Sequence, residues 1–234
     1  MSAAMMQVSG LHAFYGESHI LHGVDFEVSR GEIVALLGRN GSGRTTTLKA
    51  LLGLVGRRTG SVMINGQEAI GLPPHRIARL GVGYCPEERG IYASLSTEEN
   101  LLLPPILDAS GLALEDIYAL FPNLLERRAT QGTRLSGGEQ QMLAVARILR
   151  TGARLLLLDE ISEGLAPVIV EGLAATILEL RRRGYTLLMV EQNFRFAAPL
   201  ADRFYLMERG RMAQSFSAAE LPEKMTMVHE YLGI

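Results

Sequence analysis

The sequence contains a single cysteine, Cys85, among its 234 residues. No disulfide can form within the chain, and a reducing compartment is expected. Cys85 falls in an apolar, strand-like stretch, so we interpret it as a packing residue. The five histidines are scattered without the spacing of metal ligands, so histidine gives no indication of a metal site.

Long apolar runs and a strong net charge are also missing. No stretch approaches the ~20 apolar residues of a membrane-spanning helix, and no early run has the length and flanks of a signal peptide. The formal net charge of only −2 provides no general attraction to nucleic acid. We therefore expect a soluble, cytoplasmic protein without a nucleic-acid partner.

A glycine-rich segment stands between two apolar patterns. The preceding residues 33–37 are an unbroken apolar run, typical of a strand buried on both faces. The residues that follow repeat apolar side chains at helical spacing. A turn between such a strand and a helix start exposes backbone N–H groups, and the helix dipole adds to their positive partial charge. The segment is therefore predicted to bind an anion; it consists of Gly38, Arg39, Asn40, Gly41, Ser42, Gly43, Arg44, Thr45 and Thr46.

The spacing of this segment fits the phosphate-loop pattern G-x-x-x-x-G-K-S/T except at one position, where Arg44 replaces lysine. A chance glycine-rich turn is the alternative, but both flanks are those of a phosphate loop. We therefore predict that the loop binds a nucleoside triphosphate, with the Thr45 hydroxyl on Mg²⁺ beside the phosphates.

A second apolar run, residues 155–158, ends in two acids, Asp159 and Glu160. Carboxylates at the carboxyl end of a buried strand lie where ligands bind in open α/β sheets. We predict that Asp159 orients the Mg²⁺ shell and that Glu160 polarises an attacking water. Either acid alone could be an ordinary surface charge, but this is a poor explanation beside a phosphate loop.

A second candidate anion site opens a later helix. An ordinary serine-capped helix start is the alternative, and it would be preferred if this were the only motif. No strand pattern is found between about Leu95 and Leu149, whereas Ser96 and Glu99 have the spacing of a capping box. We therefore expect a helical insertion, about residues 90–150, within an α/β domain. The candidate anion site consists of Ser136, Gly137, Gly138 and Glu139.

The remaining segments complete the predicted fold. Hairpins are predicted at Asn65-Gly66 and at Gly210. Tyr15 precedes the phosphate loop and could stack on an adenine ring, although a tyrosine near a strand end is more often ordinary packing. Nothing remains for a separate C-terminal domain, so residues 1–234 are predicted as one domain. The segment from about Gln7 to Val28 is predicted as short strands punctuated by Gly10, Gly16 and Gly23.

With these motifs in this order, the chain resembles the ATP-binding cassette (ABC) ATPases over essentially its whole length. Residues 135–141 resemble the family signature, which is far more specific than a phosphate loop alone. The resemblance implies a P-loop NTPase-type α/β core with an antiparallel β subdomain and an inserted α-helical subdomain. It also implies a head-to-tail pair of cassettes, with each ATP between the phosphate loop of one and the signature of the other.

The resemblance further implies roles for single residues. Tyr15 matches the adenine-stacking aromatic residue, Asp159 the Mg²⁺-orienting acid and Glu160 the catalytic carboxylate. Residues 162–165 fall at the loop that meets the partner cassette.

Four positions depart from the family pattern. Glu87 stands where a glutamine usually links Mg²⁺ to the transmembrane subunit, and Gln192 stands where most members have the switch histidine. Ile161 replaces a common proline, from which little effect is expected. Arg44 keeps the charge of lysine but carries a wider planar head. ATP binding is still expected, but a γ-phosphate misplaced by ~1 Å can lower the rate ~100-fold.

Three segments resemble one branch of the family: residues 84–92, 162–167 and 190–193. That branch energises importers of branched-chain amino acids and related small amides such as urea, and the match is to the shorter of its two cassettes. The resemblance implies a different cassette as dimer partner, two transmembrane permease subunits and a periplasmic solute-binding protein. The chain would then lie on the cytoplasmic face of a bacterial inner membrane and bind ATP and Mg²⁺.

Other functions explain less of the sequence. A non-transport cassette acting on nucleic acid or ribosomes usually carries twin cassettes or a long coiled-coil insert, and this chain has neither. A P-loop kinase has no use for the signature Ser136-Gly137-Gly138. The alternative that Arg44 leaves open is a regulatory or non-transport ABC-type protein that binds ATP and hydrolyses it weakly.

Overall fold

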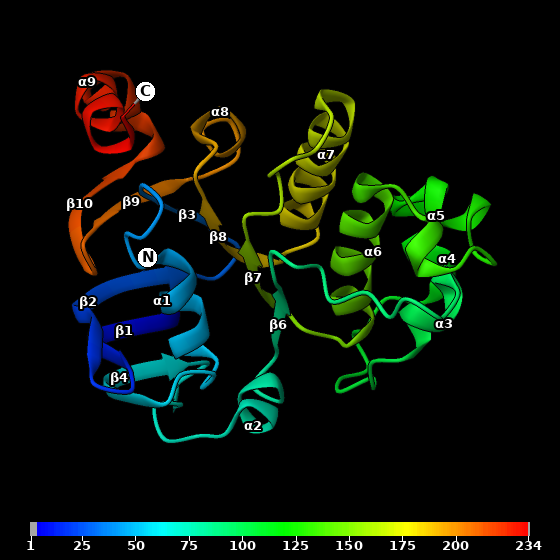
Figure 1. The fold of residues 1–234 in the computed structure, drawn as a ribbon, viewed down its shortest axis with the longest axis horizontal. Helices are drawn as coiled ribbons and strands as arrows, with labels where there is room; N and C mark the ends of the chain where they lie inside the picture. Colours follow the sequence, from blue (N-terminus) through cyan, green and yellow to red (C-terminus); the bar gives the residue numbers. More distant parts are fainter. Residues whose placement is uncertain (1–3, 234) are drawn as a thin grey trace.

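The computed structural model describes residues 4–233 as an α/β fold, and within this range the strands form two sheets (Figure 1). The smaller sheet is antiparallel and has the order β2-β1-β4-β5. Its predicted hairpin at Asn65-Gly66 is confirmed, because these residues join β4 to β5. The strands are β1 (Ala4–Tyr15), β2 (Ser18–Ser29), β4 (Arg57–Ile64) and β5 (Gln67–Glu68).

The expectation of several short strands near the N-terminus is wrong. β1 and β2 each have 12 residues and pair along their whole length. Gly16 lies in the turn between them, but Gly10 and Gly23 lie inside strands. The register of the β1–β2 ladder shifts between Val8 and Leu11, so a bulge accommodates Gly10 without ending the strand.

The larger sheet has the order β10-β9-β3-β8-β7-β6. β6, β7, β8, β3 and β9 run parallel to their neighbours, whereas β10 pairs antiparallel with β9. The hairpin predicted at Gly210 is confirmed by this last pair. The strands are β3 (Ile33–Leu37), β6 (Val82–Cys85), β7 (Leu155–Asp159), β8 (Thr186–Glu191), β9 (Arg203–Glu208) and β10 (Arg211–Ser217).

The predicted helical insertion is confirmed between β6 and β7. Within it the structure has no named strand, only an isolated bridge between Ser96 and Gln131. Ser96 and Glu99 form the expected capping box at the start of α3. Figure 1 shows these helices gathered on one side of the molecule. They are α3 (Thr97–Leu102), α4 (Leu114–Leu120), α5 (Pro122–Glu126), η1 (Gly132–Arg134) and α6 (Gly137–Arg150).

The other helices flank the larger sheet or join its strands. None of the helices in the described range has both the length and the apolar character needed to cross a membrane. The helices outside the insertion are α1 (Arg44–Leu51), α2 (Pro74–Ala78), α7 (Pro167–Arg182), α8 (Phe194–Ala197), η2 (Ala218–Glu220) and α9 (Leu221–Leu232).

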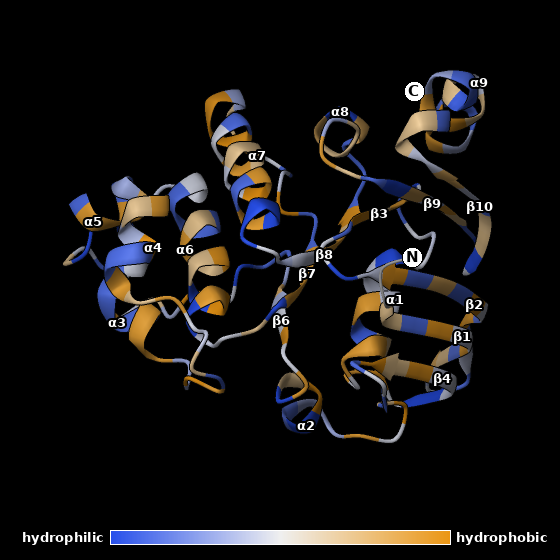
Figure 2. Cartoon of the chain, turned by 180° about the vertical axis from the view of Figure 1, so that it is seen from behind, coloured by the Kyte–Doolittle hydropathy of each residue, from blue (hydrophilic) through white to orange (hydrophobic). Residues whose placement is uncertain are grey.

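The central strands are buried on both faces. On β3, Ile33, Ala35 and Leu37 belong to a core shared with α6, α7, α8 and α9. Val34 and Leu36 belong to a second core shared with α1 and the smaller sheet. Figure 2 shows the apolar colour concentrated on these central strands and on the helix faces around them. Since both faces are filled by apolar side chains, polar chemistry is confined to the edge where the strands end.

The turn between β9 and β10 contacts the smaller sheet and the phosphate loop. The Gly210 N–H donates to the Ser42 carbonyl at 2.8 Å, and the Gly210 carbonyl accepts from the His22 N–H at 2.9 Å. A side chain at Gly210 would overlap the carbonyl oxygen of Ile20. This close approach of backbones joins the two sheets beside the phosphate loop.

Candidate nucleotide-binding and catalytic site

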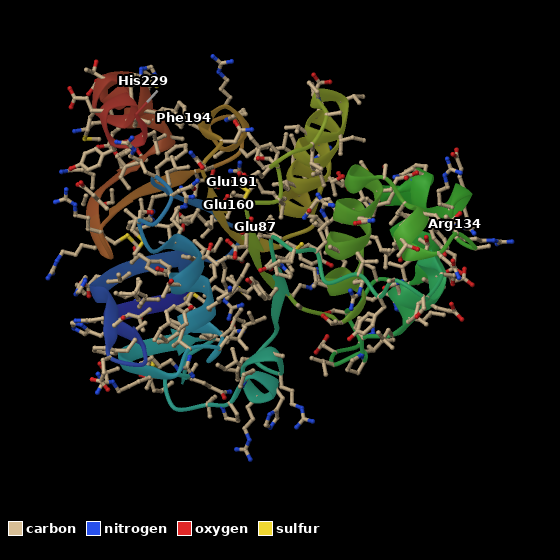
Figure 3. The ribbon with its side chains drawn as sticks, viewed as in Figure 1. Glu87, Arg134, Glu160, Glu191, Phe194 and His229 are labelled. Atoms are coloured by element: carbon tan, nitrogen blue, oxygen red, sulfur yellow. The ribbon has the colours of Figure 1, made fainter. Side chains whose placement is uncertain are left out.

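The candidate site lies at the carboxyl edge of the larger sheet. Leu37 of β3 pairs with Glu191 of β8, and Asp159 of β7 pairs with Val190. Because parallel strands end at the same edge, the segments that follow β3, β7 and β8 converge there. Figure 3 shows Glu160 near both Glu87 and Glu191, and Glu160 lines a cavity with each of them.

The phosphate loop borders a cavity of about 470 Å³. α1 begins at Arg44, and its N-cap Gly43 has φ 109°, a conformation that favours glycine. The Ser42 hydroxyl is buried without a hydrogen-bond partner among the described residues, so it is available to a phosphate oxygen. Of the predicted loop only Gly38 lies outside the lining. The cavity is lined by Ile20, Arg39, Asn40, Gly41, Ser42, Gly43, Arg44, Thr45, Thr46, Glu87, Glu160 and Glu163.

Thr45 and Asp159 form an oxygen pair that fits Mg²⁺. The Thr45 hydroxyl donates to Asp159 Oδ1 at 3.0 Å, close to the ~2.9 Å between adjacent oxygens of an octahedron with Mg–O bonds of ~2.05 Å. The Tyr84 hydroxyl donates to Asp159 Oδ2 at 3.0 Å and fixes the carboxyl group. No three His, Cys, Asp or Glu side chains within residues 4–233 could hold a metal ion together. This donor set therefore fits an ion whose other ligands are phosphate and water.

Two opposing effects act on the charge of Asp159. Burial raises the pKa of Asp159, while its hydrogen bonds from Thr45 and Tyr84 oppose this by favouring the carboxylate. The role of Tyr84 has no local signal in the sequence, because it depends on β6 pairing with β7.

Arg44 does not point freely into the cavity. Its Nη2 lies 2.6 Å from Glu160 Oε1, and the two side chains are only 3% and 10% exposed. Arg44 also donates to the Asn40 side chain and to the Glu191 carbonyl, each at 3.4 Å. Glu160 is held there by an uncommon backbone, with φ 48°. The residue in the lysine position thus pairs with the candidate catalytic carboxylate, which the sequence pattern did not indicate.

Two further acids beside Arg44 were not predicted as site residues. Glu163 is exposed, and its hydrogen bond with Glu160 is the main cause that raises the pKa of Glu163 to about 7. Burial raises the pKa of Glu191 to about 8, although the hydrogen bonds from Ser162 oppose the shift. The signal for Glu191 was present in the sequence, because it ends an apolar strand as Asp159 does.

The remaining predicted residues are distributed around this cavity. Glu87 lines it together with the phosphate loop. Gln192 is exposed and lines a neighbouring cavity of about 930 Å³, which also includes Glu160 and Glu163. Tyr15 is 43% exposed at the end of β1 and is outside the lining of both cavities. It is accessible for stacking on a planar ligand.

The serine–glycine motif of residues 136–139 lies away from the cavity of the phosphate loop. Ser136 caps α6, and its capping box with Glu139 is complete. Gly138 packs so closely on α7 that a side chain there would approach Ile169 to 2.8 Å. Residues 136–139 line neither of the cavities beside the phosphate loop. Figure 3 shows Arg134, just before this motif, well away from Glu160.

These elements match a known family. The model of the family described as ABC transporter matches residues 21–163, which include the phosphate loop, the serine–glycine motif, Asp159 and Glu160. The chain belongs to the ABC transporter family. The cassette is 40% identical to the high-affinity branched-chain amino acid transport ATP-binding protein BraG of Pseudomonas aeruginosa, over 98% of this chain and 100% of that protein.

Other comparisons agree. The cassette is 38% identical to the probable branched-chain amino acid transport ATP-binding protein LivF of Archaeoglobus fulgidus, over 98% of this chain and 99% of that protein. Its fold is similar to the crystal structure of a nucleotide-free ATP-binding cassette from an ABC transporter. The TM-score is 0.86 at 20% identity, over 99% of each chain. At this identity the structural match supports the fold alone.

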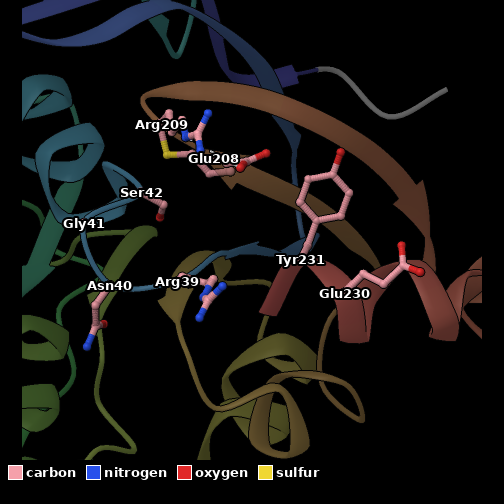
Figure 4. A pocket seen from close by; sticks show the side chains of 9 residues that line it. Arg39, Asn40, Gly41, Ser42, Glu208, Arg209, Glu230 and Tyr231 are labelled. Atoms are coloured by element: carbon pink, nitrogen blue, oxygen red, sulfur yellow. Dashed lines mark ion pairs between the residues drawn. The ribbon is translucent and has the colours of Figure 1, made fainter. Parts of the chain in front are cut away.

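The cassette has another cavity on the far side of its phosphate loop. This cavity, of about 630 Å³, also includes Met207, Glu208 and Arg209 at the end of β9. Figure 4 shows Arg39 of the loop facing Glu230 and Tyr231 from α9. Residues 39–42 therefore border both cavities. The sequence pattern of the loop did not indicate that it borders two cavities rather than one.

Proposed function

We propose that this chain is the ATP-hydrolysing subunit of an importer for branched-chain amino acids or related small amides such as urea. One observation carries the catalytic part: Thr45 and Glu160 line the cavity of the phosphate loop, and the Thr45 hydroxyl donates to Asp159 at 3.0 Å. Nearly full-length similarity to two proteins named for branched-chain amino acid transport supports the substrate class.

Each residue has a defined role in this proposal. The backbone N–H groups of residues 39–46, together with Arg44, bind the phosphates. Thr45 and Asp159 hold Mg²⁺, with Glu87 beside them; the ion, when bound, neutralises phosphate charge. A water oxygen attacks the γ-phosphorus, the bond to the β–γ bridging oxygen breaks, and Glu160 accepts the proton of the water.

Gln192 and Tyr15 complete the site. Gln192 contacts the γ-phosphate side of the nucleotide as the switch residue, and its position in one cavity with Glu160 supports this role. Tyr15, exposed at the end of β1, stacks on the adenine.

A second cassette is needed in this proposal. The motif of residues 136–139 does not line the cavity of the phosphate loop in its own chain. A head-to-tail partner, which we propose to be a different cassette, brings its own signature to that cavity and receives Ser136, Gly137, Gly138 and Glu139 in return. Residues 1–234 then act as one domain, with residues 90–150 as its helical subdomain.

The membrane partners are two permease subunits, supplied with solute by a periplasmic binding protein. A small cavity of about 190 Å³ lies between the segment after β6 and α6, and includes Arg89 and Arg147. Nearby apolar side chains are exposed and suit a cytoplasmic loop of a permease. They support our proposal that the cassette acts at the cytoplasmic face of a bacterial inner membrane. These side chains are Tyr92, Leu102, Leu103, Ile106 and Leu107.

A second candidate function follows from the ion pair between Arg44 and Glu160. Because this pair occupies both the phosphate-binding cation and the catalytic acid, a regulatory or non-transport cassette that binds ATP and hydrolyses it weakly is the alternative.

Co-expression with candidate permease and cassette subunits tests the proposal. We expect the chain to co-purify with hydrophobic membrane subunits, and the reconstituted complex to take up leucine or urea with ATP hydrolysis that Glu160→Gln removes. ATP binding without co-purification would favour the alternative, and uptake unaffected by Glu160→Gln would contradict the catalytic assignment.

A further inference from the structure

Glu191 is a buried acid that the chemistry proposed above does not use. It is only 1% exposed at the carboxyl end of β8. Its Oε2 lies 2.8 Å from the Ser162 hydroxyl, and its Oε1 accepts from the Ser162 N–H at 3.3 Å. Ser162 is itself only 3% exposed. Both carboxyl oxygens therefore hold one residue of the segment that follows β7.

The backbone of Glu191 makes a second link, to the phosphate loop. Its carbonyl accepts from Arg44 Nη1 at 3.4 Å. Leu37, the last residue of β3, lies opposite Glu191 in the sheet. A displacement of Arg44 towards a nucleotide phosphate therefore changes a contact of the residue that also holds Ser162.

Glu191 is poorly explained as a residue that only fills space in the core. A buried carboxyl group is less favourable than an apolar side chain of the same size unless its hydrogen bonds are needed. Burial raises the pKa of Glu191 to about 8, so it is mostly neutral near pH 7. It can therefore hold Ser162 while adding little negative charge beside Glu160.

We propose that Glu191 is a positioning residue that couples the place of Arg44 in the phosphate loop to the loop of residues 162–165. Ser162 lies two residues after Glu160, so a shift of this loop also shifts the catalytic carboxylate. The coupling rests on the proposed function, since there the loop meets the partner cassette and Glu160 acts on water. When ATP draws Arg44 to its phosphates, Glu191 transmits this displacement of Arg44 to the loop of residues 162–165 and to Glu160.

Kinetics of the reconstituted complex test the coupling. Glu191→Gln keeps the shape and the hydrogen-bonding groups of a neutral acid, so kcat should stay within ~3-fold. Glu191→Leu should lower kcat ~10–100-fold with little change in KM for ATP, because positioning rather than binding is lost. Ser162→Ala should behave like Glu191→Leu and Ser162→Thr like the unaltered chain. The double variant, which combines Ser162→Ala with Glu191→Leu, should be no slower than Glu191→Leu alone.

Several results would overturn the coupling. Equal kcat for the Gln and Leu variants would do so, as would additive losses in the double variant or a rise in KM alone. The serine pair keeps the test decisive if Glu191→Leu does not fold, because Ala and Thr are both small changes at that position.

A fluorescence measurement on the full chain needs no hydrolysis. Cys85 is buried, so a fluorophore attached to Ala166→Cys, on an exposed residue after the loop, labels one place. Mg²⁺-ATP should change its emission when residue 191 is Glu or Gln, and much less when it is Leu. An equal change with Leu, or none with Glu, contradicts the coupling. If the unaltered complex hydrolyses no ATP, the proposed function fails, while this measurement still decides the coupling.

Discussion

Arg44 Nη2 and Glu160 Oε1 lie 2.6 Å apart in a largely buried ion pair. The long side chain of arginine reaches from the phosphate loop to the carboxylate that follows β7. A nucleotide phosphate must therefore compete with Glu160 for the guanidinium group. Removing one partner of such a pair leaves a buried charge and typically costs about 3–5 kcal/mol of stability, so conservative substitutions test it best.

We predict that Arg44→Lys raises or preserves the turnover of the complex. Lysine keeps the charge on a compact head, which suits the γ-phosphate geometry and holds Glu160 less firmly. Single-turnover hydrolysis, with each of the two ATP sites disabled in turn, measures the effect. Lower activity, or a faster Arg44 site, would mean that the surrounding loop is adapted to arginine.

Glu160→Gln should nearly abolish hydrolysis, by ~10²–10⁴-fold, because an amide cannot accept the proton of the attacking water. ATP binding should persist or tighten, since Arg44 is released from its ion pair. Binding of a fluorescent ATP analogue and phosphate release, measured on the same samples, check both parts. Unchanged turnover would show that Glu160 is not the catalytic carboxylate.

If the partner cassette has the usual lysine in its phosphate loop, Gly137→Asp should lower the turnover of the complex more than Arg44→Ala does. The reason is that Gly137→Asp damages the site that contains this lysine. The new side chain would begin 3.4 Å from the guanidinium of Arg89, so it would also draw that group out of place. Gly172→Ala on α7 is the matched control, since its added carbon would meet only Met142 Cε at 3.6 Å. Steady-state ATPase rates compare the three, and equal losses for Gly137→Asp and Gly172→Ala would contradict the prediction.

The stability of the chain should depend on the titration of Glu191. Burial raises its pKa from 4.5 to about 8, so between these values the folded state keeps a proton that the unfolded state has released. The free energy of unfolding must therefore fall as pH rises through this window and level off above it. The free energy of unfolding, measured with urea from about pH 5.5 to about pH 9, should fall more for the unaltered chain than for Glu191→Gln. The difference over this range should be a few kcal/mol. Parallel pH curves would exclude a raised pKa.

Cysteines placed at Ile91 or Tyr92 should cross-link to a cytoplasmic loop of a permease. The segment from Glu87 to Tyr92 joins β6 to the helical insertion, so a small shift there can rotate one part against the other. Cys85 is buried and should not compete for the reagent. Cross-linking yield with and without ATP measures the contact, and its failure in every nucleotide state would remove the assignment.

Local patterns were sufficient to predict the glycine-rich turn between β3 and α1, the buried strand that ends at Asp159, and the helices inserted between β6 and β7. Each depends on neighbours in the sequence: an apolar run, glycines at fixed spacing, or the absence of strand patterns. The prediction of several short N-terminal strands failed because a bulge can hold a glycine inside a long strand. No local signal in the sequence distinguishes such a glycine from one in a turn.

The contacts within the site could not be predicted in the same way. Arg44 and Glu160 are 116 residues apart in sequence, and Tyr84 and Asp159 are 75 apart. Their meeting depends on which strands are neighbours in the sheet, and hydrophobic periodicity does not specify that order. The long side chain of Arg44 allows its ion pair with Glu160. The prediction treated Arg44 only as a substitute for the phosphate-binding lysine and did not consider this pair.

The backbone contact at Gly210 has a practical consequence for protein engineering. A two-residue turn between antiparallel strands is commonly chosen for inserting a tag or for new chain ends. Here Arg209 is exposed, but the next residue bonds to Ser42 and His22 and leaves no room beside Ile20. An insertion at this turn would separate the sheets and move the phosphate loop. The Gly184 turn, which is exposed and has open space around it, is the better place for a reporter.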